Sequence, residues 1–274
     1  MNGRLRNLGL RAAAKLPSRW LSKLKKAYYV RLLRLFSEER EPDLAIVQHL
    51  VHTGDCVVDV GANIGVYTKF LSQMVGEKGC VYSIEPVPGT FEILKANVAA
   101  LGLTNVRLRQ CAISDSEGQR IMVTPFKDTG LEDHYLAHIV QVPADPSPTC
   151  IRVEAATIDS LLPDEVHPVS FVKIDTEGHE LPCIRGASHT IERDQPALLV
   201  EMSSDFGKHG SESFKIIDLL SDHGYRPWWY DRHRLRAWQE GDRSVNYFLL
   251  HSKHVDRLQR VGIAIHDVNE RPES

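Results

Sequence analysis

Short apolar runs alternate along this chain with segments whose apolar residues recur every three or four positions. The first run, CVVDV at 56–60, is rich in β-branched valine and suits a strand buried on both faces. The segment after it, 66–74, has helical spacing. The same alternation predicts further strands at 80–84, 106–111, 121–124, 151–155, 171–175 and 197–202, and helices at 88–101, 157–162, 176–187 and 214–223.

Two more predicted strands, at 225–230 and 247–250, close the series and flank a charged hairpin. Antiparallel strands at the end of an alternating β-α series are typical of a mixed, mainly parallel sheet. The pattern therefore predicts an α/β fold. Residues 125–150 show no period and contain four prolines, which indicates a long insertion that acts as a lid or a mobile loop.

Residues 1–36 differ from the rest of the chain in charge. They carry ten Lys/Arg and no acid, whereas the remainder carries 23 bases and 36 acids. An apolar stripe at helical spacing runs through their second half, with most of the bases off it; it comprises Leu21, Leu24, Tyr28, Leu32 and Leu35. We interpret this segment first as a helix packed on the acidic domain. The alternatives are a basic amphipathic helix on an anionic membrane surface and a nucleic-acid arm, for which no binding motif is present.

The chain length bounds the domain organisation. A chain of 274 residues holds one large α/β domain with an appended segment. We expect a basic helical segment at 1–40, the α/β domain at 41–255 and a C-terminal tail at 256–274. Five isolated cysteines indicate reduced thiols and a cytoplasmic location, with peripheral contact at the inner membrane surface as the alternative for 1–36. No apolar run reaches the roughly 18 residues of a membrane span, and the N-terminus lacks a signal-peptide core.

A Gly-rich turn, GANIG at 61–65, follows the first strand. A strand, such a turn and a helix N-terminus together form a nucleotide-type site at the carboxyl edge of a sheet. The second and third glycines of the dinucleotide fingerprint G-x-G-x-x-G are absent. Glu85, twenty residues after Gly65, stands where an acid accepts the hydroxyl hydrogens of a ribose. Asp59 disfavours a pyrophosphate and suits a ligand with a cationic end, such as S-adenosylmethionine with its sulfonium and ammonium groups.

Five segments stand in a specific order between about residues 50 and 250: VVDVGANIGVYT, SIEPVPGTFEILKANV, CAISDSEG, TIDSL and FVKIDTEGHE. Together they resemble the FkbM-type S-adenosylmethionine-dependent methyltransferases. The resemblance implies a seven-stranded class I methyltransferase fold with a C-terminal antiparallel hairpin. It also implies O-methylation of a small-molecule or carbohydrate acceptor that it does not identify. No nucleic acid is expected as a partner, because the chain carries no binding motif for one. By that likeness the cofactor's methionine end would be lined by Asp59, Gly61, Asn63 and Gly65, its ribose held by Glu85, and its adenine flanked by Ala112 and Ser114.

The segment DTEGHE at 175–180 offers three carboxylates and an imidazole where the fourth buried strand ends. A hydroxyl acceptor needs a group that helps to remove its proton. We expect Asp175 to face cofactor and acceptor, and His179 or Glu177 to act as the base. A divalent metal on some of these oxygens stays open, and no metal ligand is assigned. Lys173, two residues earlier, is expected to pair with a carboxylate.

The leading hypothesis is a methyltransferase that acts on a hydroxyl of a sugar, glycolipid or secondary metabolite. The alternatives are a nucleic-acid or protein methyltransferase that uses the basic arm, a membrane-associated cofactor-binding protein without catalysis, and a nicotinamide oxidoreductase. The spacing of His134 and His138 fits a metal pair on a helix. We interpret these two histidines as surface residues, ahead of a substrate lid or a metal site.

Overall fold

The computed structural model describes residues 18–123, 138–140, 150–162, 168–202, 208–242 and 244–267. His134 lies outside these residues. His138 falls in a short strand, whereas the proposed metal pair required a helix.

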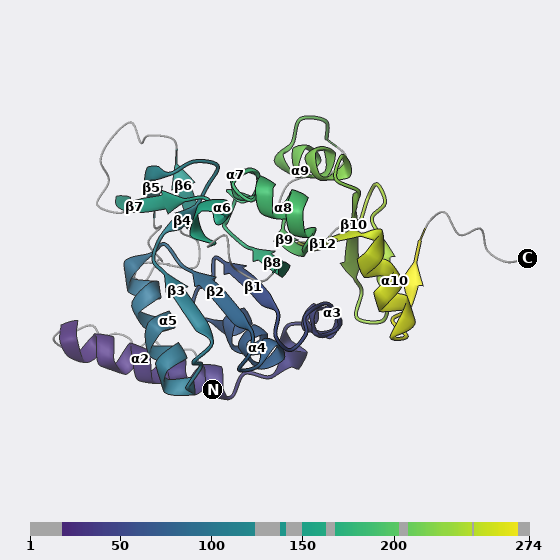
Figure 1. The fold of residues 1–274 in the computed structure, drawn as a ribbon. Helices are drawn as coiled ribbons and strands as arrows, with labels where there is room; N and C mark the ends of the chain where they lie inside the picture. The colour runs from purple at the N-terminus through teal and green to yellow at the C-terminus, as the bar shows by residue number, and fades with distance from the viewer. Residues whose placement is uncertain are drawn as a thin grey trace, which may run out of the picture.

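A nine-stranded sheet forms the centre of the described part of the chain (Figure 1). Its strand order is β13-β11-β10-β12-β9-β8-β1-β2-β3. The strands are β1 (Cys56–Val60), β2 (Cys80–Ile84), β3 (Val106–Arg109), β8 (Val169–Ile174), β9 (Ala197–Glu201), β10 (Tyr225–Tyr230), β11 (Leu235–Ala237), β12 (Asn246–His251) and β13 (Ile265–His266).

The middle of the sheet is parallel and its closing strands are antiparallel, as the sequence predicted. β1 pairs in parallel with β2 and β8, and β8 with β9, whereas β12 is antiparallel to both β9 and β10. All five residues of β1 are buried, as expected for a strand covered on both faces. The seven strands from β3 to β10 match the seven-stranded sheet with a C-terminal antiparallel hairpin that the resemblance implied. β11 and β13 extend it beyond the predicted seven strands.

The helices cover two faces of this sheet (Figure 1). One apolar core contains residues of the four helices α6, α7, α8 and α9, and the other contains residues of α3, α4 and α10. The bounds are α3 (Leu44–Leu50), α4 (Val66–Val75), α5 (Pro88–Leu101), α6 (Ile158–Leu161), α7 (Glu180–Arg185), α8 (Ser188–Asp194), α9 (Glu212–Ser221) and α10 (Ser252–Arg260), with a 3-10 turn η1 (Glu38–Arg40) before α3.

A second, four-stranded sheet was not predicted. It comprises β4 (Ala112–Ile113), β5 (Gly118–Val123), β6 (His138–Val140) and β7 (Cys150–Ala156), in the order β4-β7-β5-β6. The predicted strand at 106–111 therefore ends at Arg109, and the chain enters the small sheet at Ala112. That sheet packs its own apolar cluster, which includes Val87 from the main domain.

The predicted helix at 176–187 is wrong in its first turn. Residues 176–179 form a loop in which Glu177 and Gly178 have positive φ, 54° and 95°. A right-handed helix cannot contain two such residues. The helical part of the predicted segment is α7, which ends at Arg185, and a separate helix, α8, begins at Ser188. Pro182 sits in the first turn of α7, where proline is tolerated.

The N-terminal helix α2 (Ser18–Arg34) packs against α5. Lys26 pairs with Glu92 on α5 at 2.8 Å, and Arg34 donates to the Ala100 carbonyl at 2.9 Å. The packed-helix interpretation is therefore confirmed for this segment. Its contact face is a different one from the predicted stripe, because Leu33 is the buried residue while Leu24 is exposed.

The C-terminal boundary differs from the expected one. α10 crosses residue 255, and β13 pairs with β11, so residues up to 267 join the main domain. Among the described residues, no helix is long and apolar enough to span a membrane.

Candidate functional site

A cavity of about 230 Å³ opens at the carboxyl ends of the central strands. Because the strand order is β9-β8-β1-β2, the ends of these strands supply successive parts of its wall. Its lining residues used below are Gly61, Asn63, Glu85, Val87, Ala112, Ile113, Met122, Ile139, Asp175, Glu177, His179 and Glu201.

The Gly-rich turn brings two strand ends into close contact. Gly61 has φ 72°, and a Cβ there would lie 1.7 Å from the backbone oxygen of Asp175. Only glycine allows this approach. Asn63 also has positive φ, and its Oδ1 atom is buried without a hydrogen-bond partner among the described residues. A ligand donor in the cavity can satisfy this acceptor.

Glu85 is held rigidly at the end of β2. Its carboxylate oxygens accept the backbone N–H groups of Asn63 at 3.0 Å and Val87 at 2.9 Å. Burial raises the pKa of Glu85 to about 7, although these two hydrogen bonds act in the opposite direction. A carboxylate offers about four acceptor positions, so two remain for hydroxyl donors of a ligand.

Next to Glu85 the cavity wall is apolar. Val87 lies two residues after Glu85. The small sheet contributes Ala112, Ile113, Met122 and Ile139. Apolar side chains of this kind suit the faces of a flat aromatic ring. The unpredicted small sheet thus forms one side of the site.

The loop after β8 is shaped by a buried carboxylate. Oε1 of Glu180 accepts hydrogen bonds from Thr176 N at 3.2 Å, Thr176 Oγ1 at 3.1 Å and Gly178 N at 3.0 Å. These bonds hold Glu177 in a left-handed conformation that costs a non-glycine residue about 1–2 kcal/mol. Backbone strain of this kind is common at functional sites.

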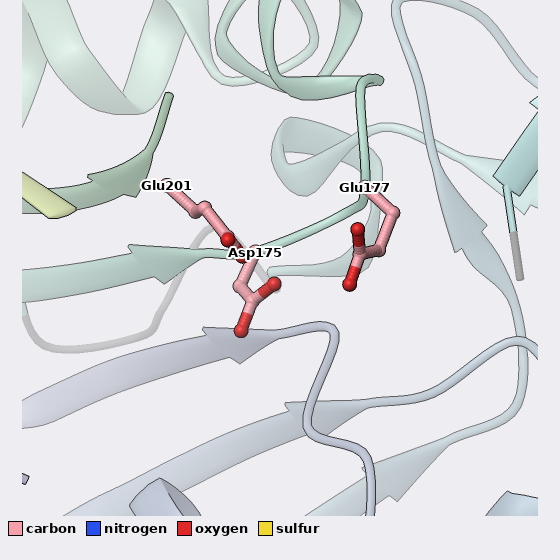
Figure 2. Close-up of side chains that lie close together, drawn as sticks. All are labelled: Asp175, Glu177 and Glu201. Atoms are coloured by element: carbon pink, nitrogen blue, oxygen red, sulfur yellow. The ribbon is translucent and has the colours of Figure 1, made fainter. Parts of the chain in front are cut away.

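Three acidic side chains converge at this end of the cavity (Figure 2). Asp175 directly follows β8, Glu177 lies in the loop after it and Glu201 ends β9. A carboxylate oxygen from each lies within 4.8 Å of the others. Such an oxygen set can hold a hard divalent cation. It also concentrates negative charge beside the Gly-rich turn.

Asp175 and Glu201 share a hydrogen bond that separates their pKa values. The bond to Asp175, burial and repulsion from neighbouring carboxylates raise the pKa of Glu201 to about 8. For Asp175, burial is outweighed by the charge of Lys173 and the hydrogen bond from Glu201, so its pKa is lowered. At neutral pH the pair therefore holds one proton, on Glu201.

Lys173 lies in β8, two residues before Asp175. Its Nζ atom is 2.9 Å from Asp175 and 3.9 Å from Asp59, which confirms the expected pairing with a carboxylate. Burial opposes its charge, but the two carboxylates raise its pKa overall. Asp59 is fully buried and accepts a 2.6 Å hydrogen bond from Thr68. Asp59 therefore acts on the site through Lys173.

His179 contacts the residue that was predicted to flank the adenine. Its Nε2 atom lies 3.0 Å from Ser114 Oγ. Burial, followed by the charge of Arg120, lowers the pKa of His179, so the ring is neutral at pH 7. A neutral imidazole can bind or orient a hydroxyl group.

The family described as "Methyltransferase FkbM domain" matches residues 59–227, which is more than half of the chain. The chain belongs to this family. The resemblance seen in the sequence is thereby confirmed.

The chain is also similar to individual proteins. It is 26% identical over 196 residues to the 31-O-demethyl-FK506 methyltransferase FkbM of Streptomyces tacrolimicus, with 63% of this chain and 73% of that protein covered. It is 28% identical over 162 residues to the hexuronic acid methyltransferase AglP of Haloferax volcanii, with 59% of this chain and 57% of that protein covered.

Among solved structures, a methyltransferase FkbM from Methylobacillus flagellatus superposes with a TM-score of 0.48 at 18% identity. The match covers 73% of this chain and 44% of that one. The chain thus spans under half the length of this structural relative.

The cavity brings together seven of the ten predicted site residues. Asp59, Gly65 and Ser114 are not among the described residues that line it. Gly65 directly precedes α4 and has φ 94°, and Ser114 reaches the site through His179. The cofactor and catalytic roles of all ten remain predictions. Glu201 was missed, although an acid at the carboxyl end of a central strand was the same signal that identified Asp175.

Proposed function

We propose that this protein transfers a methyl group from S-adenosylmethionine to a hydroxyl of a sugar, glycolipid or secondary metabolite. The observation that carries the proposal is the acidic cluster of Asp175, Glu177 and Glu201 beside the Gly61 turn. The cluster places a pair of carboxylates that can act as a base, and a negative charge that attracts a cation, at the same strand ends.

Three parts of the cavity wall support this cofactor. The carboxylates suit a cationic sulfonium and ammonium, and the free acceptor positions of Glu85 suit ribose hydroxyls. The apolar wall from Val87 to Ile139 suits adenine. When bound, the cofactor supplies an activated methyl carbon to an aligned acceptor.

The Asp175–Glu201 pair is then the general base. An isolated aspartate is a weak base. The pair loses its remaining proton, on Glu201, near pH 8, and a base is most effective when its pKa is close to the working pH. Once Glu201 is ionised, its carboxylate can accept the acceptor's hydroxyl proton as the methyl group is transferred. Glu177 and His179 line the same cavity and orient the acceptor.

The names of the two curated relatives support the acceptor class. One acts on 31-O-demethyl-FK506 and the other on a hexuronic acid. Both names describe oxygen-rich small molecules or sugars.

Calorimetric titration tests the cofactor. We expect micromolar binding of S-adenosylmethionine and its demethylated product, loss of that binding in Glu85→Ala, and unchanged binding in Glu117→Ala, a matched exposed glutamate outside the cavity. Affinity should fall below about pH 7, because ribose hydroxyls donate to ionised Glu85. Binding of NAD in place of S-adenosylmethionine would refute the proposal. A screen of acceptor pools with methyl-labelled cofactor and mass spectrometry then identifies the product.

A further inference from the structure

Helix α2 presents two different faces. Leu33 is 1% exposed and lies against the domain. Leu24, nine residues earlier and therefore half a turn away around the helix, is 54% exposed. Packing on α5 explains the first face and leaves the second without a role in the fold.

The outer face carries a row of large apolar side chains. Trp20 is 52% exposed and Tyr28 is 61% exposed, and with Leu24 they stand four residues apart, which aligns them along one side of a helix. Leu35, directly after the helix, is 72% exposed. Six large apolar side chains are exposed in the described part of the chain, and these four are among them. Such a concentration on one surface marks an interaction site.

Bases surround this row. Lys23 and Lys25 flank Leu24 on its two sides, and Arg31 stands within the row. All three are exposed, and Lys23 Nζ lies 5.4 Å from the centre of the Trp20 ring. α2 contains no acid at all. The face is therefore apolar and aromatic along its centre and positively charged at its edges.

We propose that this outer face of α2 docks on an anionic lipid bilayer. Trp20, Leu24 and Tyr28 enter the boundary between headgroups and acyl chains, while Lys23 and Lys25 meet the lipid phosphates. This composition is that of helices lying in the plane of a membrane interface. The ten bases of residues 1–36, without any acid, complement an anionic surface, whereas the same face of a second copy would bring bases against bases.

The backbone at the end of α2 is hydrogen-bonded to α4, so a test of the outer face must keep this segment in place. Lys69 on α4 donates hydrogen bonds to the carbonyl oxygens of Leu33 at 3.1 Å and Phe36 at 2.9 Å. Deleting residues 1–36 would remove both acceptors and disturb the domain. Substitutions confined to exposed side chains of α2 avoid this problem.

The experiment is co-sedimentation of the full chain with phosphatidylcholine vesicles that contain or lack phosphatidylglycerol. One variant carries Trp20→Gln, Leu24→Gln and Tyr28→Gln, which removes the apolar row and keeps the charge. A second carries Lys23→Gln, Lys25→Gln and Arg31→Gln. Val261→Gln, an exposed apolar residue outside α2, is the matched control.

We expect binding to the anionic vesicles only. The charge variant should bind about 100-fold more weakly, because each base near an anionic surface contributes about 1 kcal/mol. The apolar variant should also lose at least about tenfold, and the control should bind like wild type. Absent binding, or wild-type binding by both variants, refutes the proposal. Dimerisation that only the apolar variant loses, without vesicle binding, would assign the face to a second copy. Binding of S-adenosylmethionine should be equal in all variants, so this result is independent of the proposed function.

Discussion

At Gly61 the close approach of two backbones depends on the absence of a side chain. A Cβ at this position would lie 1.7 Å from the Asp175 backbone oxygen, and φ is 72°. Gly54 provides a matched control, because its φ is also positive, 95°, while a Cβ there would meet no described atom within 4 Å. The two glycines thus separate the cost of the left-handed conformation from the cost of the steric clash.

We expect Gly54→Ala to lower the free energy of unfolding by about 1–2 kcal/mol. Gly61→Ala should lose that amount and a further 1–3 kcal/mol or so for overpacking. Urea denaturation of both variants measures the difference. Equal losses would show that β1 and the end of β8 separate easily, contrary to the close packing of the turn.

A site residue was predictable from the sequence where its position directly after a buried strand was enough to place it in the cavity. Glu85 and Asp175 follow buried strands, and both line the cavity. Asp59 lies one residue before the end of its strand, so its side chain points to the opposite face from a terminal residue. It is buried against Thr68 and Lys173. That orientation depends on which face of β1 each neighbouring helix covers, which the sequence alone does not state.

At the scale of elements, the ends of β8 and β9 act together. Asp175 and Glu201 come from neighbouring parallel strands, and the shared proton requires both. The loop from 176 to 179 completes the arrangement because Glu180 folds back on it. The sequence predicted a helix over 176–187 because apolar residues recur there at helical spacing. The hydrogen bonds of a single buried carboxylate outweigh that local preference.

The Asp175–Glu201 base predicts a pH dependence. Below about pH 8 Glu201 keeps its proton, and the lowered pKa of Asp175 makes it a poor base. As the pH rises to about 8, the pair loses that proton, so kcat/KM should rise roughly tenfold per pH unit and then level off. Glu201→Gln removes the titrating group and should flatten this part of the profile while lowering its plateau.

Glu177→Gln is the control for this profile. It removes a carboxylate of the same cluster and leaves the Asp175–Glu201 pair in place, so the rise should persist. Steady-state kinetics from pH 6 to 9 with an identified acceptor provides the measurement. If Glu201→Gln retains the wild-type rise, another group is the base.

On the scale of the whole molecule, the parts that the sequence could not predict depend on contacts between residues that lie far apart along the chain. The central sheet was predictable because each parallel strand is a continuous apolar run. The small sheet was not, because β4 has two residues and pairs with β7 about forty residues later. The contact face of α2 was also missed. Its apolar spacing suggested burial, whereas α5 and Lys69 select the opposite face.

If α2 is an integral part of the fold, its two faces should differ sharply in their effect on stability. Leu33→Ala and Leu24→Ala are the same substitution on the same helix, one on the buried face and one on the exposed face. Leu33→Ala should lower the free energy of unfolding by about 2–5 kcal/mol, since it leaves a cavity beside the domain. Leu24→Ala should change it by less than about 0.5 kcal/mol. Urea denaturation followed by circular dichroism and tryptophan fluorescence measures both variants. Similar small losses in the two variants would mean that α2 lies on the domain without contributing to its stability.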